Sequence, residues 1–188
     1  MAVGLGNPGP EFAHTRHNAG ADTIALLAAR RGEKLKRARA DRSLTAEVRV
    51  DGRRLALAFP QTYMNDSGFA VGRLARRYEI DDLARLVIVH DELDLPLGRL
   101  QVKLGGGLAG HNGLRSIKAH LHSDGFARVR IGIGKPPGRQ QGADHVLDRP
   151  GPAERRELDV SIEMAADAVE MILAEGIDGA QNRFNGLS

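Results

Sequence analysis

An unbroken apolar run within RLVIVHD, residues 85–91, is the feature that most constrains how this chain can fold. A strand that is apolar at successive positions is buried on both faces, which is typical of a parallel sheet covered by helices. Strand-like and helix-like patterns interleave along the remainder of the chain, and one hairpin intervenes. We therefore predict an α/β fold: a single domain, residues 1–188, with a mixed twisted β-sheet flanked by α-helices on both sides.

The remaining elements follow from hydrophobic periodicity and from turn residues. Strands are expected at 1–5, 44–50, 55–59, 100–104 and 128–134. The first helix is expected to begin at about residue 18 and to end at Gly32, and further helices are expected at 67–78, 114–121 and 152–175. Asp51 and Gly52 are a strong signal for a two-residue hairpin turn. Residues 135–142 are the clearest loop, because they combine proline, glycine and polar residues.

The amino-acid composition excludes several kinds of catalytic and structural site. The chain contains no cysteine, which excludes a disulfide scaffold, a thiolate nucleophile and every zinc site that uses cysteine. The attacking atom must then be an oxygen, a nitrogen or water. No apolar run reaches the roughly 18 residues of a membrane span, and the N-terminal residues lack a secretory pattern. We therefore expect a cytoplasmic protein.

The net charge of +3 hides an uneven distribution. Residues 99–139 hold eight lysines and arginines against one acid, residues 30–54 hold ten against four, and residues 141–188 hold ten acids against four arginines. Two basic segments on one face would suit a polyanion such as nucleic acid, and a solvated arginine-rich surface is the alternative. The absence of tryptophan argues against a base-stacking platform.

The glycines at 4, 6 and 9 match the spacing of a dinucleotide-binding loop. Pro8 and Pro10 leave few backbone N–H groups for a pyrophosphate, and the position about 20 residues on that should hold an acid holds alanine and arginine. We infer instead a turn that carries the chain across the carboxyl edge of the first strand. In open α/β sheets this edge is where functional sites form.

Polar side chains follow the predicted strands at that edge. His17 directly precedes the first helix, Asp91 ends the central strand, and Asn7, Asn65 and Asn112 lie in loops. Each residue alone has a structural explanation, because asparagine favours turns and a single histidine is more often structural than catalytic. Together, a carboxylate that orients an imidazole and several amides suit activation of water by a base and recognition of peptide-like or sugar groups.

Other chemistries fit less well. No serine lies in a G-x-S-x-G turn, which argues against an acyl-enzyme of the α/β-hydrolase type. The histidine spacings match no known zinc pattern in full, so we expect no metal. The side chains weighed for a metal were His14 with His17, His120 with His122, and His90 and Asp91 with His111. The loop 105–113 lacks the Lys-Ser/Thr of a P-loop, and its glycines permit close approach or mobility.

Five segments together strongly resemble the bacterial peptidyl-tRNA hydrolase family and occur in the family's order. They are residues 3–20, 61–68, 90–98, 105–116 and 128–138. The resemblance implies hydrolysis of the ester between a peptide and the 3′-terminal ribose of tRNA, without metal or cofactor. It implies peptidyl-tRNA as the partner, through its acceptor arm and 3′ end. We expect a monomer with no membrane partner.

The resemblance also assigns roles to individual residues. His17 matches the general base that activates water, Asp91 matches the residue that holds this base, and Asn7 matches the amide that distinguishes a blocked N-terminus. Further matches concern substrate binding. They are the amides of Asn65 and Asn112, the aromatic contacts Phe12 and Tyr63, and the basic residues Lys103 and Arg130 that face tRNA phosphates.

Three positions depart from the family's pattern. Phe12 stands where many members have tyrosine, so a hydroxyl is missing, and Leu108 and Ala109 stand where His-Gly or Glu-Gly is usual. Two rival functions follow from other observations. One is an RNA-binding protein on the same fold that has lost catalysis, which an intact His17 and Asp91 oppose. The other is a nucleotide-binding oxidoreductase, which the lack of a second Rossmann strand opposes.

Overall fold

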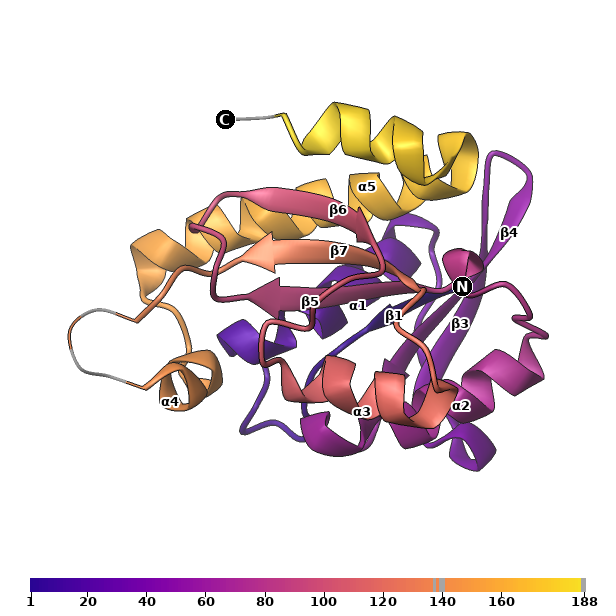
Figure 1. The fold of residues 1–188 in the computed structure, drawn as a ribbon, viewed down its shortest axis with the longest axis horizontal. Coiled ribbons are helices and arrows are strands. Elements are labelled where there is room, and N and C mark those ends of the chain that lie inside the picture. Colours follow the sequence, from indigo (N-terminus) through magenta and orange to yellow (C-terminus); the bar gives the residue numbers. More distant parts are fainter. Residues whose placement is uncertain (137, 139–140, 187–188) are drawn as a thin grey trace.

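The computed structural model describes residues 1–136, 138 and 141–186, and within them one sheet of seven strands forms the centre of the molecule (Figure 1). Its strand order is β2-β3-β4-β1-β5-β7-β6. The strands are β1 (Ala2–Gly4), β2 (Lys36–Ala38), β3 (Ser43–Val50), β4 (Arg53–Pro60), β5 (Val87–Glu92), β6 (Leu100–Leu104) and β7 (Ala127–Gly132).

The pairing of these strands is mixed. β1 is parallel to both β4 and β5, and β5 is parallel to β7. The outer pairs β2/β3, β3/β4 and β6/β7 are antiparallel. Because β1 and β5 are parallel neighbours, the segments that follow them meet at one edge of the sheet. The predicted fold class is confirmed.

Helices cover both faces of the sheet, as Figure 1 shows. They are α1 (Ala19–Arg30), α2 (Ser67–Arg77), α3 (Asn112–Leu121), α4 (Gly142–Leu147) and α5 (Pro152–Phe184), and the short 3₁₀ helices are η1 (Arg16–Asn18), η2 (Arg39–Asp41), η3 (Met64–Asp66) and η4 (Leu83–Arg85). α1 and α5 lie on one face, and α2 and α3 lie on the other. Among the described residues, no helix has the length and apolar character that crossing a bilayer requires.

The apolar run in β5 is explained by the two cores that these helices create. Val87 and Val89 pack into the core under α1 and α5, and Ile88 packs into the core under α2 and α3. All three side chains are buried. Alternate side chains of a strand point to opposite faces, so a strand between two helical layers is apolar at every position.

Gly4 is required by close packing between β1 and α1. A Cβ added to Gly4 would lie 2.1 Å from the carbonyl oxygen of Gly20, and one added to Gly20 would lie 2.1 Å from that of Val89. Gly20 is in the first turn of α1, so this helix crosses β1 and β5 with almost no space between them. The first glycine of the G-x-G-x-x-G spacing thus allows a helix to approach a strand.

Three segments differ from the prediction. β2 is an additional strand, three residues long and largely exposed at the sheet edge. α4 begins at Gly142, the last residue of the predicted loop 135–142, while residues 137, 139 and 140 of that loop lie outside the described residues. α5 continues beyond the predicted end at 175 to Phe184, across a kink at Gly176 where φ is 84°.

The acidic helix α5 neutralises part of the basic segment 30–54. Arg30 pairs with Glu163, and it also pairs with Asp167 at 2.8 Å. Arg31 pairs with Glu170 at 2.6 Å. At the other end of the segment, Arg53 donates hydrogen bonds to backbone carbonyls of α5. Part of the positive charge of this segment is therefore balanced within the fold.

Candidate active site

A cavity of about 150 Å³ opens at the edge of the sheet where β5 ends. Its lining comes from four parts of the chain: the turn η1, the end of β5, the glycine-rich loop with the start of α3, and α4. The lining residues are His17, Asp91, Glu92, Leu93, Ala109, Gly110, His111, Asn112, Gly142, Ala143 and Val146. Sites in open α/β sheets form in this position.

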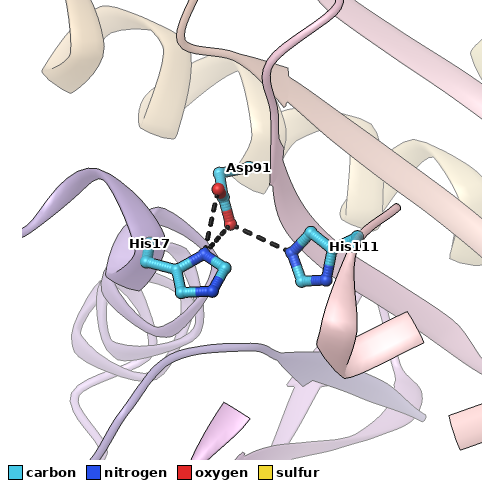
Figure 2. Close-up of side chains that lie close together, drawn as sticks. All are labelled: His17, Asp91 and His111. Atoms are coloured by element: carbon cyan, nitrogen blue, oxygen red, sulfur yellow. Dashed lines mark hydrogen bonds and ion pairs between the residues drawn. The ribbon is translucent and has the colours of Figure 1, made fainter. Parts of the chain in front are cut away.

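His17 and Asp91 are hydrogen-bonded in this cavity (Figure 2). The Nδ1 of His17 lies 2.9 Å from Oδ1 and 3.0 Å from Oδ2 of the carboxylate. A carboxylate only accepts hydrogen bonds, so Nδ1 carries the proton and Nε2 has the lone pair. The side chain of His17 is 11 % exposed and that of Asp91 is 1 % exposed. The prediction that these two residues meet is therefore confirmed.

A second histidine completes the environment of this carboxylate. The Nε2 of His111 lies 3.1 Å from Oδ1 of Asp91 (Figure 2). On the other side of the ring, Nδ1 of His111 accepts hydrogen bonds from the backbone N–H groups of Gly113 and Leu114 at the start of α3. Because Nδ1 accepts, Nε2 carries the proton and donates to Asp91. Asp91 is thus held by two imidazoles.

The electrostatics of this group follow from burial and from the opposite charges. Burial of the ring lowers the pKa of His17, but the charge of Asp91 and its hydrogen bond outweigh burial, so the pKa is raised above its ordinary value. Burial raises the pKa of Asp91, but the charges of His17 and His111 and the hydrogen bonds from both rings outweigh it and hold the pKa far below its usual range. Asp91 therefore remains a carboxylate.

The hydrogen bonds of these three residues do not fit a metal ion. His17, Asp91 and His111 are a group, within the described part of the chain, whose ligand atoms lie within 4.8 Å of one another. A metal would need the lone pair of His111 Nε2, yet the two backbone N–H groups at Nδ1 require the proton to be on Nε2. The other histidines considered for a metal have separate partners: His14 contacts Asp22, and His120 contacts the carbonyl of Ser116.

The side chain of Asn7 is fixed by its neighbours. Its Oδ1 accepts a hydrogen bond of 2.7 Å from the backbone N–H of Met64. Its backbone N–H and carbonyl are both hydrogen-bonded to the side-chain amide of Asn18, at 2.9 Å each. Because Oδ1 is already used, Nδ2 is the group with which Asn7 can donate to a ligand. Asn7 is 7 % exposed.

The other four predicted recognition residues differ in their relation to the cavity. Asn112 is exposed and lines the cavity with His17 and Asp91. Asn65 is exposed in η3, directly after the Met64 that binds Asn7, and it is not part of the cavity lining. The rings of Phe12 and Tyr63 meet edge to face with centroids 6.3 Å apart, and Tyr63 is 59 % exposed.

Lys103 and Arg130 lie on β6 and β7, and neither lines the cavity. Lys103 packs beside Gly106 and has no ion-pair partner among the residues described. Arg130 is different, because its side chain is 15 % exposed and donates to Glu92, at 2.8 Å from Nη2, and to Gln101. A phosphate that binds Arg130 would have to compete with these partners.

Two residues near the site were not assigned a role from the sequence. His111 was considered only as a metal ligand, and its contact with Asp91 depends on how loop 105–111 folds. Arg128 is 1 % exposed and donates to the carbonyls of Gly105, Gly106 and Gly107, at 2.7 Å for the last. It therefore fixes the start of the loop that carries His111. No pattern in the sequence distinguished Arg128 from a surface arginine of the same strand.

The chain resembles known proteins along its whole length. The family model described as peptidyl-tRNA hydrolase matches residues 1–188. A peptidyl-tRNA hydrolase of Frankia alni is 51 % identical over 189 residues, covering 100 % of this chain and 94 % of that protein. One of Mycolicibacterium vanbaalenii is 50 % identical over 182 residues, covering 97 % and 94 % respectively.

Solved structures agree with the sequence comparison. A crystal structure of peptidyl-tRNA hydrolase from Acinetobacter baumannii superimposes with a TM-score of 0.92 at 37 % identity, covering 100 % of this chain and 94 % of that one. The two chains therefore share the same fold.

Proposed function

Since this chain belongs to the peptidyl-tRNA hydrolase family, we propose that it hydrolyses the ester between an N-blocked aminoacyl or peptidyl group and the 3′-terminal ribose of tRNA. The products are free tRNA and free peptide, so the reaction recycles tRNA from aborted translation. The observation that carries the proposal is the pair formed by His17 and Asp91, in which Nε2 of His17 is left basic beside a cavity.

His17 acts as the general base. Its Nε2 takes a proton from a water molecule as the water oxygen attacks the ester carbonyl carbon. Asp91 accepts from Nδ1–H and stabilises the imidazolium that forms. When the tetrahedral intermediate collapses, the bond to the ribose 3′ oxygen breaks and Nε2–H returns the proton to that oxygen. Atoms and charges balance without another reagent.

The amides recognise the acyl part of the substrate. Nδ2 of Asn7 donates to a carbonyl of a blocked amino group, and its fixed orientation makes this donor specific. Asn112, at the cavity, and Asn65, beside Met64, donate to the peptide and the tRNA end and help to place the water. Phe12 and Tyr63 provide apolar contact next to them.

Lys103 and Arg130 are proposed to contact tRNA phosphates, and Lys103 is the more available of the two. A phosphate at Arg130 would replace Gln101 or share the guanidinium with Glu92. We further propose that residues 1–188 act as one domain and as a monomer in the cytoplasm, where aborted peptidyl-tRNA arises.

A comparison of two esters tests the proposed function. The protein is incubated with N-acetyl-aminoacyl-tRNA and, separately, with free aminoacyl-tRNA, and release of the amino acid is followed over time. We expect cleavage of the blocked ester only. Binding of tRNA without cleavage of either ester would contradict the proposal and favour the non-catalytic RNA-binding alternative.

A further inference from the structure

Three arginines surround a hollow of about 350 Å³ at the edge of the sheet away from β6. Arg37 comes from β2, Arg39 from η2, and Arg42 from the residue that follows η2. All three are exposed, and Ala38, Ser43 and Gln61 complete the lining. This group, which we name the arginine pocket, is part of neither the cavity at His17 nor the region of Lys103.

The charge of the arginine pocket is not balanced by the fold. The other arginines of segment 30–54 have partners: Arg30 and Arg31 pair with α5, Arg53 donates to α5, Arg49 donates to a carbonyl, and Arg54 pairs with Glu47. For Arg37, Arg39 and Arg42, no acid within 4.0 Å is found in the described chain. Three unpaired guanidinium groups around one hollow favour a ligand with several anionic oxygens.

Neighbouring arginines hold the pocket in place. Arg73 of α2 donates to the carbonyl of Ala40 at 2.6 Å, and Arg77 pairs with Asp41 at 2.5 Å. These contacts tie η2 to α2. The fold therefore uses two arginines to fix the turn from which Arg39 and Arg42 project, and leaves those two side chains uncommitted.

Arg42 is also preorganised. Its φ is 46°, its backbone N–H donates to the carbonyl of Arg39, and its own carbonyl accepts from Gln61 at 2.7 Å. Its guanidinium lies 5.3 Å from the centre of the Phe69 ring. Stacking on an aromatic ring limits the freedom of the side chain while the N–H groups remain available to a ligand.

A second hollow runs from the arginine pocket to the residues next to Asn7 and Met64. It has a volume of about 550 Å³ and shares Arg42 and Gln61 with the arginine pocket. At its other end lie Pro8, which follows Asn7, and Tyr63, which precedes the Met64 bound to Asn7. This groove therefore extends from beside Asn7 to the arginine pocket, and it shares no lining residue with the cavity at His17.

The two sides of the active site differ in chemistry. The cavity at His17 includes the apolar side chains Leu93, Ala143 and Val146, which suit a peptide. The groove is lined by aromatic, cationic and polar groups and by one acid, Asp66, and it leads to three arginines. We infer that the 3′ arm of tRNA follows this groove and that the arginine pocket binds its phosphates. This inference rests on the proposed function and adds a second phosphate site.

A triple substitution tests this site. In Arg37→Gln/Arg39→Gln/Arg42→Gln, we expect KM for N-acetyl-aminoacyl-tRNA to rise roughly tenfold or more at constant kcat, because phosphate contacts contribute binding alone. The dependence of log affinity for deacylated tRNA on log salt should become shallower by about 2, given a slope of about 0.7 per single-strand phosphate contact. The matched control is Arg76→Gln/Arg156→Gln/Arg183→Gln, which removes the same charge from exposed arginines outside both hollows.

A short substrate separates this inference from the proposed function. The N-acetyl-aminoacyl ester of adenosine lacks the phosphates, so the triple variant should cleave it at the wild-type rate. Equal KM values and salt slopes for the triple variant and its control would overturn the inference, as would a loss restricted to substrates with acidic peptides. Failure of the wild-type protein to cleave either ester would contradict the proposed function, while the binding comparison would still test the pocket.

Discussion

At the scale of single residues, Asp91 decides the chemistry of the site. It accepts from Nδ1 of His17 and from Nε2 of His111, and its own side chain is buried. This arrangement fixes the tautomer of both rings and directs the lone pair of His17 to Nε2. A base of raised pKa and a permanent carboxylate are the expected partners for activation of water near neutral pH.

Replacement of His17 tests its role as the base. In His17→Ala, we expect kcat to fall by roughly 10²- to 10⁴-fold, because proton transfer to a positioned side chain contributes about this much. The Kd for tRNA should stay close to that of the wild type, since His17 makes no phosphate contact in the proposed complex. Single-turnover hydrolysis and filter binding measure the two quantities. His122→Ala, at an exposed position, is the control, and near wild-type turnover in His17→Ala would exclude the mechanism.

Replacement of Asp91 tests the origin of the raised pKa. A base works when neutral, so activity falls as the pH drops through the pKa of His17, which lies above its ordinary value of 6.5. In Asp91→Asn the charge that raises this pKa is gone and burial, which lowers it, remains. We expect the acid limb of kcat/KM to move to lower pH and the maximum to fall roughly 10²- to 10⁴-fold.

The pH profile should be measured beside that of Asp94→Asn, which changes an exposed carboxylate that pairs with Lys135 and does not line the cavity. This control should keep the wild-type profile. An acid limb that stays in place or moves to higher pH in Asp91→Asn would contradict the electrostatic account of His17.

At the scale of elements, periodicity identified the strands and the long helices that form the two cores, but it missed α4, which contributes Val146. β5, β6 and α2 match their predicted bounds to within one or two residues. β2 and α4 were not predicted because neither has an apolar period: β2 is a short charged edge strand and α4 has six residues. Their form depends on a partner strand and on the neighbouring chain, which local sequence does not reveal.

The candidate site was predictable where it follows directly from strand ends. Asp91 ends a strand that is the parallel neighbour of β1, and the turn after β1 leads to His17, so the contact between Asp91 and His17 follows from the topology. The contact of His111 with Asp91 and the partners of Arg130 follow from loop geometry and from side chains packed across the sheet. The spacing of these residues along the sequence does not predict those contacts.

The glycine-rich loop offers a test with its own control. Gly106 has a φ of 90°, and its carbonyl accepts from the buried Arg128 at 2.8 Å. Gly107 is next to it, but a Cβ there would meet nothing within 4 Å. We expect Gly106→Ala to lower the free energy of unfolding by about 1–2 kcal/mol, because alanine disfavours this φ. Gly107→Ala should change it by less than about 0.5 kcal/mol.

Urea unfolding measures both variants, and hydrogen exchange at residues 105–111 reports on the loop itself. Faster exchange in Gly106→Ala alone would agree with a loop whose start is fixed by Arg128. Equal destabilisation by the two substitutions would show that the backbone angle at Gly106 is not what holds the loop.

At the scale of the whole molecule, the two ends of the chain hold the active site together. Arg16, directly before the proposed base, is buried and donates to Glu154 of α5 through two bonds of 2.5 and 2.6 Å. It also donates to backbone carbonyls at 145 and 148, at 3.1 Å each. Helix α5 therefore fixes the turn that carries His17, although it lies outside the cavity.

Removal of the carboxylate at Glu154 tests this long-range contact. In Glu154→Ala the buried Arg16 loses its only charged partner within the described residues, and we expect the free energy of unfolding to fall by roughly 2–4 kcal/mol. We also expect a lower kcat, because His17 is less firmly placed. Glu157→Ala on the same helix, at an exposed position without a salt bridge in the described chain, should leave both quantities nearly unchanged.

The contact between Arg16 and Glu154 also has a consequence during synthesis of the chain, because its two residues are made at different times. A ribosome releases the N-terminal segment first, so residues 7 and 17 emerge long before their partners. A fragment that ends before Asn112 lacks part of the active site, and one that ends before Glu154 lacks the contact that fixes Arg16. We therefore expect copies of this protein that are cut short before Glu154 to be less active than chains whose synthesis has passed the start of α5.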